Sequence, residues 1–266
     1  MRRRGVIGLG LIAGATAGAG AVAIAGDGDG HGDADRPAPR AALPAERHVA
    51  ALAIPEPRPL GDEPDLSRWA HLRRRVAARG HPGRGARVVA RVGRRTPEGT
   101  VTAVPVTGRR RGTDGRLWLR ITLPVLPNGT SGWVPRRSLG AYEISRHRLV
   151  IDLGRRRLTL LRRGRVVLRA PVGVGTARWP TPRGTFLIRN RLQRYASPQY
   201  GPVAFGTSAR SPTLTDWPAG GFIGIHGTDT PDLVPGRVSH GCVRLRNPDI
   251  LRLAGLMPVG TPVEIR

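Results

Sequence analysis

The sequence contains no lysine, so all 44 of its cationic residues are arginine. Acidic residues are also scarce, and the 18 Asp and Glu leave a formal net charge of +26. Such a surface attracts polyanions, which include nucleic acid, anionic lipid headgroups and acidic polymers. Charge alone does not choose among these partners. A solvated arginine surface that reflects only the coding bias of a GC-rich genome explains the composition equally well.

Cysteine is nearly absent, and the single residue, Cys242, excludes an internal disulfide. A lone thiol is either a small buried apolar group or a reactive one. Long helical segments are not expected either, because 37 glycines and 25 prolines favour turns and short strands.

The N-terminal segment has the layout of an export signal. Arg2, Arg3 and Arg4 precede an uncharged run, and Ala23-Ile24-Ala25 supplies a small-x-small cleavage signal. Residues 1–26 are therefore predicted to be a signal peptide or an uncleaved membrane anchor. Either reading places the rest of the chain outside the cytoplasm, which argues against nucleic acid as a partner.

Two segments follow before the C-terminal half. Residues 27–80 are predicted to be a flexible linker, rich in Asp, Pro, Ala and Gly, with a short helix over 66–80. Residues 81–140 are predicted to form a small β module. Its ending, Gly132-Trp133-Val134-Pro135, resembles the last strand of bacterial SH3-like modules, which implies a small SH3-like β-barrel. Trp118 and Trp133 are expected in its core or along a peptide groove.

Residues 141–266 are predicted to be a mostly β domain of two packed sheets. One helix is expected near the end. Asn247 is a candidate cap for that helix and Pro248 suits its first position, while Ile250, Leu251 and Ala254 give it an apolar face. The expected strands are Arg148–Leu153, Leu158–Leu161, Val166–Val174, Thr185–Asn190, Gly201–Phe205, Phe222–His226, Val243–Leu245 and Thr261–Ile265.

Two histidines lie near the lone thiol. His240 stands two residues before Cys242, and His226 ends a separate apolar strand. A thiol accepts an acyl group only as thiolate, so it needs a base or a cation nearby. Gly227 and Gly241 beside these residues let substrate backbone approach and leave amides to stabilise an oxyanion.

Less reactive interpretations remain open at this point. His240 suits a hydrogen-bonded core position, and Cys242 suits a small buried filler. Zinc binding by His226, His240 and Cys242 offers only three ligands and no familiar pairing.

The run His226-Gly227, a gap, and Ser239-His240-Gly241-Cys242 followed by Val243-Arg244 resembles the signature of the YkuD-type L,D-transpeptidases. The segments Pro171–Gly175 and Pro180–Phe186 also resemble early strands of that family. The resemblance covers 141–266 and implies a YkuD-type β-sandwich catalytic domain with one short helix after the cysteine strand. It implies no metal and no organic cofactor.

The resemblance also implies roles for individual residues. Cys242 would be the nucleophile and His226 the general base, with its ring held by the carbonyl of Gly227. His240 and the amides of Gly241 and Cys242 would form or shape the oxyanion site. Ser239 would fix the turn. Arg244 would pair with a stem-peptide carboxylate, although an ordinary surface arginine is an equal alternative.

The implied substrates are peptidoglycan stem peptides, as acyl donor and as acceptor, joined by 3→3 cross-links. Carbapenems would acylate Cys242. Water as acceptor would make the chain an L,D-carboxypeptidase, and a protein acceptor would make it a wall-attachment enzyme. A non-catalytic wall-binding role is the alternative of another class. The basic face would contact anionic wall polymers or the membrane surface.

Overall fold

The computed structural model describes residues 66–193, 197–214 and 221–266. The expected signal peptide or anchor over 1–26 and the linker over 27–65 lie outside these residues. Across the described ranges, no helix combines the length and the hydrophobicity that a membrane span requires. Strands dominate these ranges and one α-helix is present, which confirms the prediction of a mostly β chain.

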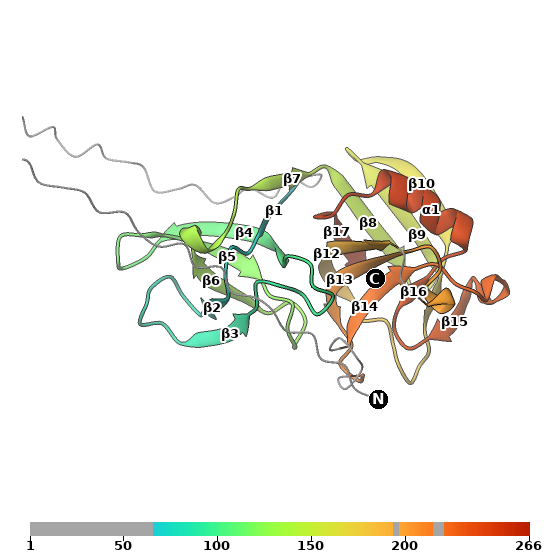
Figure 1. The fold of residues 1–266 in the computed structure, drawn as a ribbon, viewed down its shortest axis with the longest axis horizontal. Helices are drawn as coiled ribbons and strands as arrows, with labels where there is room; N and C mark the ends of the chain where they lie inside the picture. The colour runs from blue at the N-terminus through green and yellow to red at the C-terminus, as the bar shows by residue number, and fades with distance from the viewer. Residues whose placement is uncertain (1–65, 194–196, 215–220) are drawn as a thin grey trace, which may run out of the picture. The chain divides into compact units, whose positions relative to one another are not determined.

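The N-terminal part of the described chain is one antiparallel sheet of seven strands (Figure 1). Its spatial order is β3-β2-β6-β5-β4-β1-β7. The bounds are β1 Ser67–His71, β2 Val76–Arg79, β3 Val88–Val92, β4 Ala103–Arg111, β5 Leu117–Thr122, β6 Ser131–Pro135 and β7 Glu143–Ser145, with the 3₁₀ turn η1 Arg136–Ser138 after β6. We call residues 67–145 the upstream module.

The predicted helix over 66–80 is wrong, because this segment forms β1 and β2. Strand β1 lies between β4 and β7, and β2 lies between β3 and β6, so pairing with distant strands overrides the local pattern. Val76 and Ala78 are buried at alternate positions, as a strand requires. The module therefore begins before residue 81 and ends after residue 140. Trp118 is buried, as expected of a core residue, and Trp133 is half-buried.

The C-terminal domain is built on a ladder of ten strands in the order β10-β9-β8-β17-β12-β13-β14-β16-β11-β15. The bounds are β8 His147–Asp152, β9 Arg157–Arg162, β10 Arg165–Pro171, β11 Gly173–Gly175, β12 Gly184–Gln193, β13 Val203–Arg210, β14 Phe222–His226, β15 Gly236–Ser239, β16 Val243–Arg244 and β17 Pro262–Ile265. The 3₁₀ turns η2 Pro198–Tyr200 and η3 Pro231–Leu233 connect some of them.

Strand β12 joins the two halves of this ladder. Its first residues, 184–187, pair with β17, and its later residues, 188–193, pair with β13. The two predicted sheets are thus one continuous ladder that shares a strand. Apolar residues from both halves enclose a single core, which includes Leu149, Leu160, Phe205, Ile225 and Val263.

The single α-helix, α1 Asn247–Leu256, follows β16 and packs on this core through Ile250, Leu253 and Ala254. Two details differ from the sequence prediction. Leu251 faces solvent. Asn247 is the first helical residue rather than the cap, and its side chain is engaged elsewhere, as described below.

The upstream module packs against the C-terminal domain at a small apolar cluster of Trp69, Ala103 and Leu187. Gly260, which has φ +83°, lies under the Trp69 indole, and any side chain there would overlap the ring. A hydrogen bond from Ser67 Oγ to Gly260 O, 3.1 Å long, lies beside this contact.

Candidate active site

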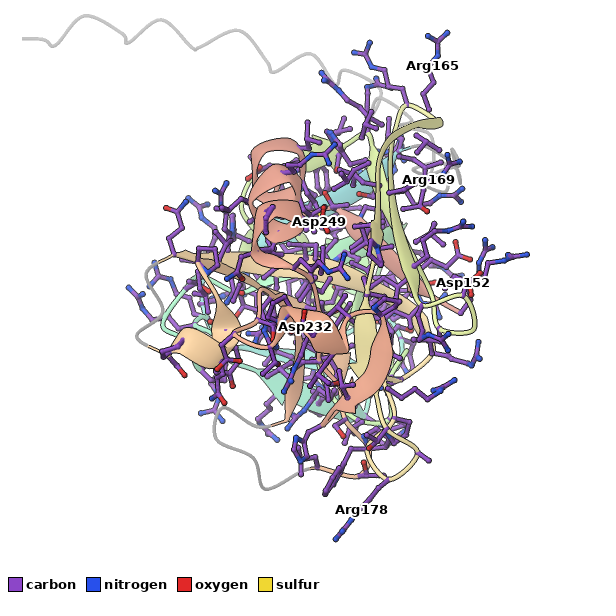
Figure 2. All side chains as sticks on the ribbon, turned by 90° about the vertical axis from the view of Figure 1, so that its right-hand side faces the viewer. Asp152, Arg165, Arg169, Arg178, Asp232 and Asp249 are labelled. Atoms are coloured by element: carbon purple, nitrogen blue, oxygen red, sulfur yellow. The ribbon has the colours of Figure 1, made fainter. Side chains whose placement is uncertain are left out.

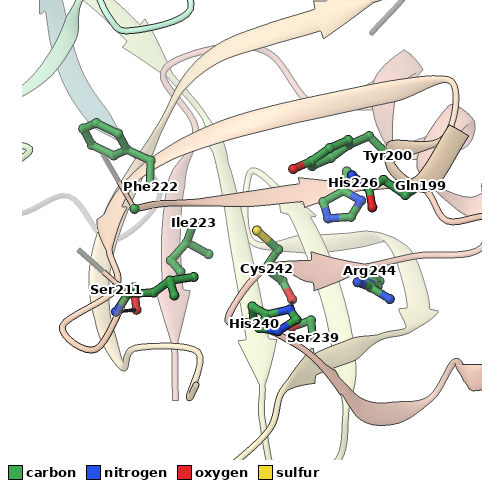
Figure 3. Close-up of a pocket in the computed structure, with 12 residues that line it drawn as sticks. Gln199, Tyr200, Ser211, Phe222, Ile223, His226, Ser239, His240, Cys242 and Arg244 are labelled. Atoms are coloured by element: carbon green, nitrogen blue, oxygen red, sulfur yellow. Dashed lines mark hydrogen bonds between the residues drawn. The ribbon is translucent and has the colours of Figure 1, made fainter. Parts of the chain in front are cut away.

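Two neighbouring parallel strands carry the residues that the sequence singled out. In the register of β14 and β16, His226 lies opposite Arg244. Side chains two positions apart on a strand point to the same face. Gly224 and His226 therefore share a face of β14, and Cys242, just before β16, shares a face with Arg244. Figure 3 shows the cysteine sulfur and the histidine ring in one pocket.

Cys242 is half-buried, and the amide of Gly224 donates a hydrogen bond to its Sγ at 3.3 Å. Burial raises the pKa of the thiol, and the Gly224 amide and Arg244 oppose that effect only in part. The thiol is therefore protonated at neutral pH. Deprotonation needs a base at the moment of reaction.

His226 is positioned to be that base. Its side chain is buried, and Nδ1 lies 2.6 Å from the carbonyl oxygen of Gly227. A carbonyl only accepts hydrogen bonds, so Nδ1 carries the proton and Nε2 is the free acceptor. Burial lowers the pKa of His226 to about 4, despite the Gly227 hydrogen bond that raises it. The ring of Tyr200 packs 4.7 Å away, centroid to centroid.

The turn before Cys242 is closed by Ser239. Its Oγ donates to the carbonyl of Cys242 at 2.5 Å and accepts from the amide of Gly241 at 3.1 Å. The Gly241 amide thus holds the turn through Ser239. Gly241 has φ +114°, a conformation that favours glycine.

A second hydroxyl braces the same turn from the far side. Thr181 is buried, and its Oγ1 donates to Gly241 O at 2.8 Å and accepts from Gly175 N at 2.9 Å. These hydrogen bonds join the segments Pro171–Gly175 and Pro180–Phe186 to the cysteine turn. The sequence indicated that both segments belong with the cysteine motif, but it did not predict the hydrogen bonds of Thr181.

His240 is exposed at the rim of the pocket, so the alternative of a core histidine is wrong. Its ring packs against Trp179, with centroids 4.2 Å apart. Figure 3 shows Arg244 to the right of Cys242, and it lines the smaller cavity together with His240. Its Nε is buried, and none of the described residues accepts a hydrogen bond from that atom.

Two cavities meet at Cys242 and His226. The smaller, about 160 Å³, is also lined by Ser239, His240 and Arg244. The larger, about 330 Å³, is also lined by Glu98, Arg189, Leu192, Gln199, Tyr200, Ala204, Phe205, Gly206, Phe222, Ile223 and Gly224. The two cavities share Gln199, Tyr200, Phe222 and Ile223 as well as Cys242 and His226, so they are adjoining parts of one cleft around the sulfur. Within the described residues, no cluster of three His, Cys, Asp or Glu side chains suits a metal ion.

The sequence did not predict that Asn247 would hold the backbone of residues 227 and 228, which follows His226. Asn247 Oδ1 accepts the amide of Thr228 at 3.0 Å, and this oxygen fills the space where a side chain on Gly227 or Gly201 would lie. The first residue of α1 thus fixes the backbone whose carbonyl orients His226. The asparagine resembled a helix cap in the sequence, which concealed this role.

A family model described as the L,D-transpeptidase catalytic domain (YkuD) matches residues 146–265. The Bacillus subtilis protein named as L,D-transpeptidase YkuD is 35% identical over 124 residues, covering 47% of this chain and 68% of that protein. A Bacillus licheniformis relative with the same name is 37% identical over 119 residues, covering 45% of this chain and 65% of that protein. The chain thus spans about two thirds of the length of these relatives.

Solved structures of L,D-transpeptidases are also similar to this chain. One is from Enterococcus faecium, with 23% identity and a TM-score of 0.35, covering 45% of this chain and 49% of that chain. Another is from Mycobacterium smegmatis, with 17% identity and a TM-score of 0.37, covering 56% of this chain and 90% of that chain.

Proposed function

The chain belongs to the YkuD family of L,D-transpeptidases, and we propose that it forms 3→3 cross-links between peptidoglycan stem peptides through a thioester on Cys242. Enzymes of this family are acyltransferases. The observation that carries the proposal is the half-buried sulfur beside His226, whose Nδ1 is bound to Gly227 O, at the junction of two cavities.

In the first step, Sγ of Cys242 attacks the carbonyl carbon of the third stem residue, usually a diamino acid, of a tetrapeptide. Nε2 of His226 takes the thiol proton as the C–S bond forms. The bond to the terminal D-Ala then breaks, and His226 returns the proton to its departing amine. The neutral thiol and neutral imidazole that burial produces are the reactants this step requires.

The tetrahedral intermediate carries a negative oxygen that needs hydrogen-bond donors. We propose the amide of Cys242 as one donor and the ring of His240, on the rim of the smaller cavity, as another. Each preorganised donor of this kind typically contributes about 10²–10³ in rate. The Ser239 and Thr181 hydrogen bonds hold the turn that directs the Cys242 amide.

In the second step, a primary amine from a neighbouring stem attacks the thioester carbonyl. His226 takes a proton from the attacking nitrogen, the C–S bond breaks, and Cys242 recovers a proton from His226. The products are the cross-linked peptide and the free enzyme. Water in place of the amine would give hydrolysis and a tripeptide.

Arg244 is the proposed anchor for a stem-peptide carboxylate. It lines the smaller cavity, and its buried Nε has no acceptor within the described residues. A planar guanidinium fits a carboxylate through two parallel hydrogen bonds. The smaller cavity is therefore the proposed donor side of the site.

We propose that the protein is exported and acts in the cell envelope, as the N-terminal segment predicts. Anionic wall polymers are its proposed contact through the β9–β10 hairpin, where Figure 2 shows Arg165 and Arg169 projecting from the strand. Arg157, Arg162 and Arg163 are exposed on the same hairpin. Binding to purified walls should weaken steeply with added salt, since screening acts strongly on exposed charges.

Muropeptide analysis by mass spectrometry tests the proposed reaction. The purified protein is incubated with disaccharide tetrapeptides, with Cys242→Ala as the control. New 3→3 dimers together with released D-Ala, both absent from the control, support transpeptidation. Tripeptides alone would replace the proposal with L,D-carboxypeptidase activity. Unchanged substrate would refute catalysis and favour a wall-binding role.

A further inference from the structure

Two turns of the upstream module, in addition to Trp69, contact the C-terminal domain, and one of them lies in the wall of the larger cavity. In one turn, Asn128 forms a pair of hydrogen bonds with the backbone of Arg210, of 2.8 and 3.0 Å. In the other, Glu98 Oε1 meets Arg189 Nη2 at 2.6 Å. These contacts fix the position of the module on strands β12 and β13.

The turn that carries Glu98 is itself rigid. The amide of Thr96 donates to Thr100 O at 2.8 Å, and the two hydroxyls of these residues are 2.8 Å apart. The amide of Gly99 donates to Thr96 O at 2.9 Å. The carboxylate is therefore held at a defined place rather than on a freely moving loop.

Arg189 is the ion-pair partner of the Glu98 carboxylate. Its side chain is 2% exposed, its Nε donates to Thr207 O at 2.8 Å, and its guanidinium lies over the Phe222 ring at 3.9 Å. Asn190 Nδ2 lies 3.3 Å from Glu98 Oε2. Burial would raise the pKa of Glu98, but Arg189 outweighs it and holds that pKa below its usual value. Glu98 is thus ionised at neutral pH.

Glu98 still reaches the larger cavity, where it shares the lining with Cys242 and His226. Its side chain is 16% exposed, so its oxygens are not fully enclosed by Arg189. It is the one acidic residue among the described residues that line either cavity. Arg189 lines the same cavity and is paired with Glu98, so the larger cavity holds an ion pair whose carboxylate is partly exposed, whereas the smaller cavity holds Arg244.

We propose that the larger cavity is the acceptor site and that Glu98, supplied by the upstream module, binds the ammonium group of the incoming amine. The inference rests on the proposed transpeptidase function and adds the recognition of its second substrate. A primary alkyl amine has a pKa of about 10, so it arrives as a cation. A carboxylate beside the thioester would concentrate it there.

The bound cation must lose a proton to water before it can attack. The neutral amine then forms the C–N bond, His226 takes its second proton, and the C–S bond breaks to restore the Cys242 thiol. Glu98 is a binding group in this scheme and does not act as the base.

The test separates acylation from transfer. Wild type and Glu98→Gln are compared for D-Ala release without acceptor, and for transfer to a stem-peptide amine over a range of concentrations. Transfer to hydroxylamine, which is uncharged at neutral pH, is measured in parallel. Glu143→Gln is the matched control, because Glu143 is an exposed carboxylate on β7 of the same module.

The expected result is that Glu98→Gln raises the KM for the stem-peptide amine about tenfold, as loss of a charge-assisted hydrogen bond predicts. D-Ala release and transfer to hydroxylamine should change less than about twofold, and Glu143→Gln should match wild type. A KM for the charged amine that stays unchanged would overturn the inference. Equal losses with both acceptors would overturn it too, because they indicate a purely structural brace.

A melting curve shows whether Glu98→Gln folds. If it does not, Glu98→Gln combined with Arg189→Met replaces the buried ion pair without leaving a lone buried charge. The same selective rise in KM is expected of the double variant, and its absence contradicts the inference. If wild type itself releases no D-Ala, the proposed function fails, and that outcome is distinct from failure of the Glu98 assignment.

Discussion

The amide of Gly224 and the sulfur of Cys242 are joined by a hydrogen bond of 3.3 Å across the parallel strands β14 and β16. The N–H favours negative charge on the sulfur, but burial is the stronger effect and raises the pKa of the thiol. The pairing of two strands, rather than a charged partner, thus holds the sulfur beside His226. The resting site is a neutral thiol and a neutral imidazole.

This neutral pair predicts the pH dependence of acylation. The rate of carbapenem acylation of Cys242 should hold steady from pH 7 to pH 5 and fall near pH 4, where His226 becomes protonated. Mass spectrometry of quenched samples gives the rate at each pH. A loss of rate centred near 6.5, the ordinary pKa of histidine, would show that His226 is not desolvated as described.

The same burial links His226 to stability. The unfolded chain binds a proton on this residue at an ordinary pKa of about 6.5, whereas the folded chain does so at about 4. The neutral, buried imidazole therefore contributes its full stabilisation above pH 6.5. As the pH falls from 6.5 to 4, the free energy of unfolding decreases by on the order of 3 kcal/mol. Urea unfolding measured at pH 7 and at pH 4.5 should show a smaller change in unfolding free energy for His226→Asn than for wild type. Identical pH effects would contradict the prediction.

Thr181→Val tests the brace behind the cysteine turn. Removal of the hydroxyl leaves the amide of Gly175 without its acceptor, which should lower the free energy of unfolding by about 1–3 kcal/mol. The turn also loses its bond to Gly241 O, so acylation should slow about tenfold or more. Thr185→Val is the control, because Thr185 is exposed on β12. A Thr181→Val variant that acylates as fast as wild type would show that the hydroxyl does not support the cysteine turn during acylation.

Asn247→Ala tests the support of the histidine loop. The buried amide of Thr228 would lose its acceptor, at a cost of about 1–3 kcal/mol in unfolding free energy. The Gly227 carbonyl would no longer be fixed, so the maximal acylation rate should fall more than the affinity for the donor. Kinetics of acylation at several carbapenem concentrations separate the two. Arg252→Ala, on the exposed face of α1, should behave as wild type.

The sequence predicted the strands that carry the site better than it predicted the upstream module. Strand β14 and the helix after β16 have local signals, namely an apolar run that ends at His226 and a proline in the first helical turn. The segment 66–80 has no such signal, because β1 and β2 exist only through pairing with strands that lie far along the chain. Its apolar spacing suited a helix equally well.

The site residues divide in the same way. Cys242, His226 and Arg244 stand in a recognisable pattern within one stretch of sequence, and the fold brings them together on two adjacent strands. Glu98 lies in a turn that no local pattern connects to Cys242, and only the folded chain brings it to the cavity. Asn247 was noted in the sequence, but its position at the start of a helix suggested a helix cap rather than a hydrogen bond to the amide of Thr228.

The most direct test of the central claim is the mass of the intact protein after incubation with a carbapenem. Because Cys242 is the only cysteine, one covalent adduct is expected on wild type and none on folded Cys242→Ala. The absence of an adduct on wild type, or an adduct that survives Cys242→Ala, would contradict the assignment of Cys242 as the nucleophile.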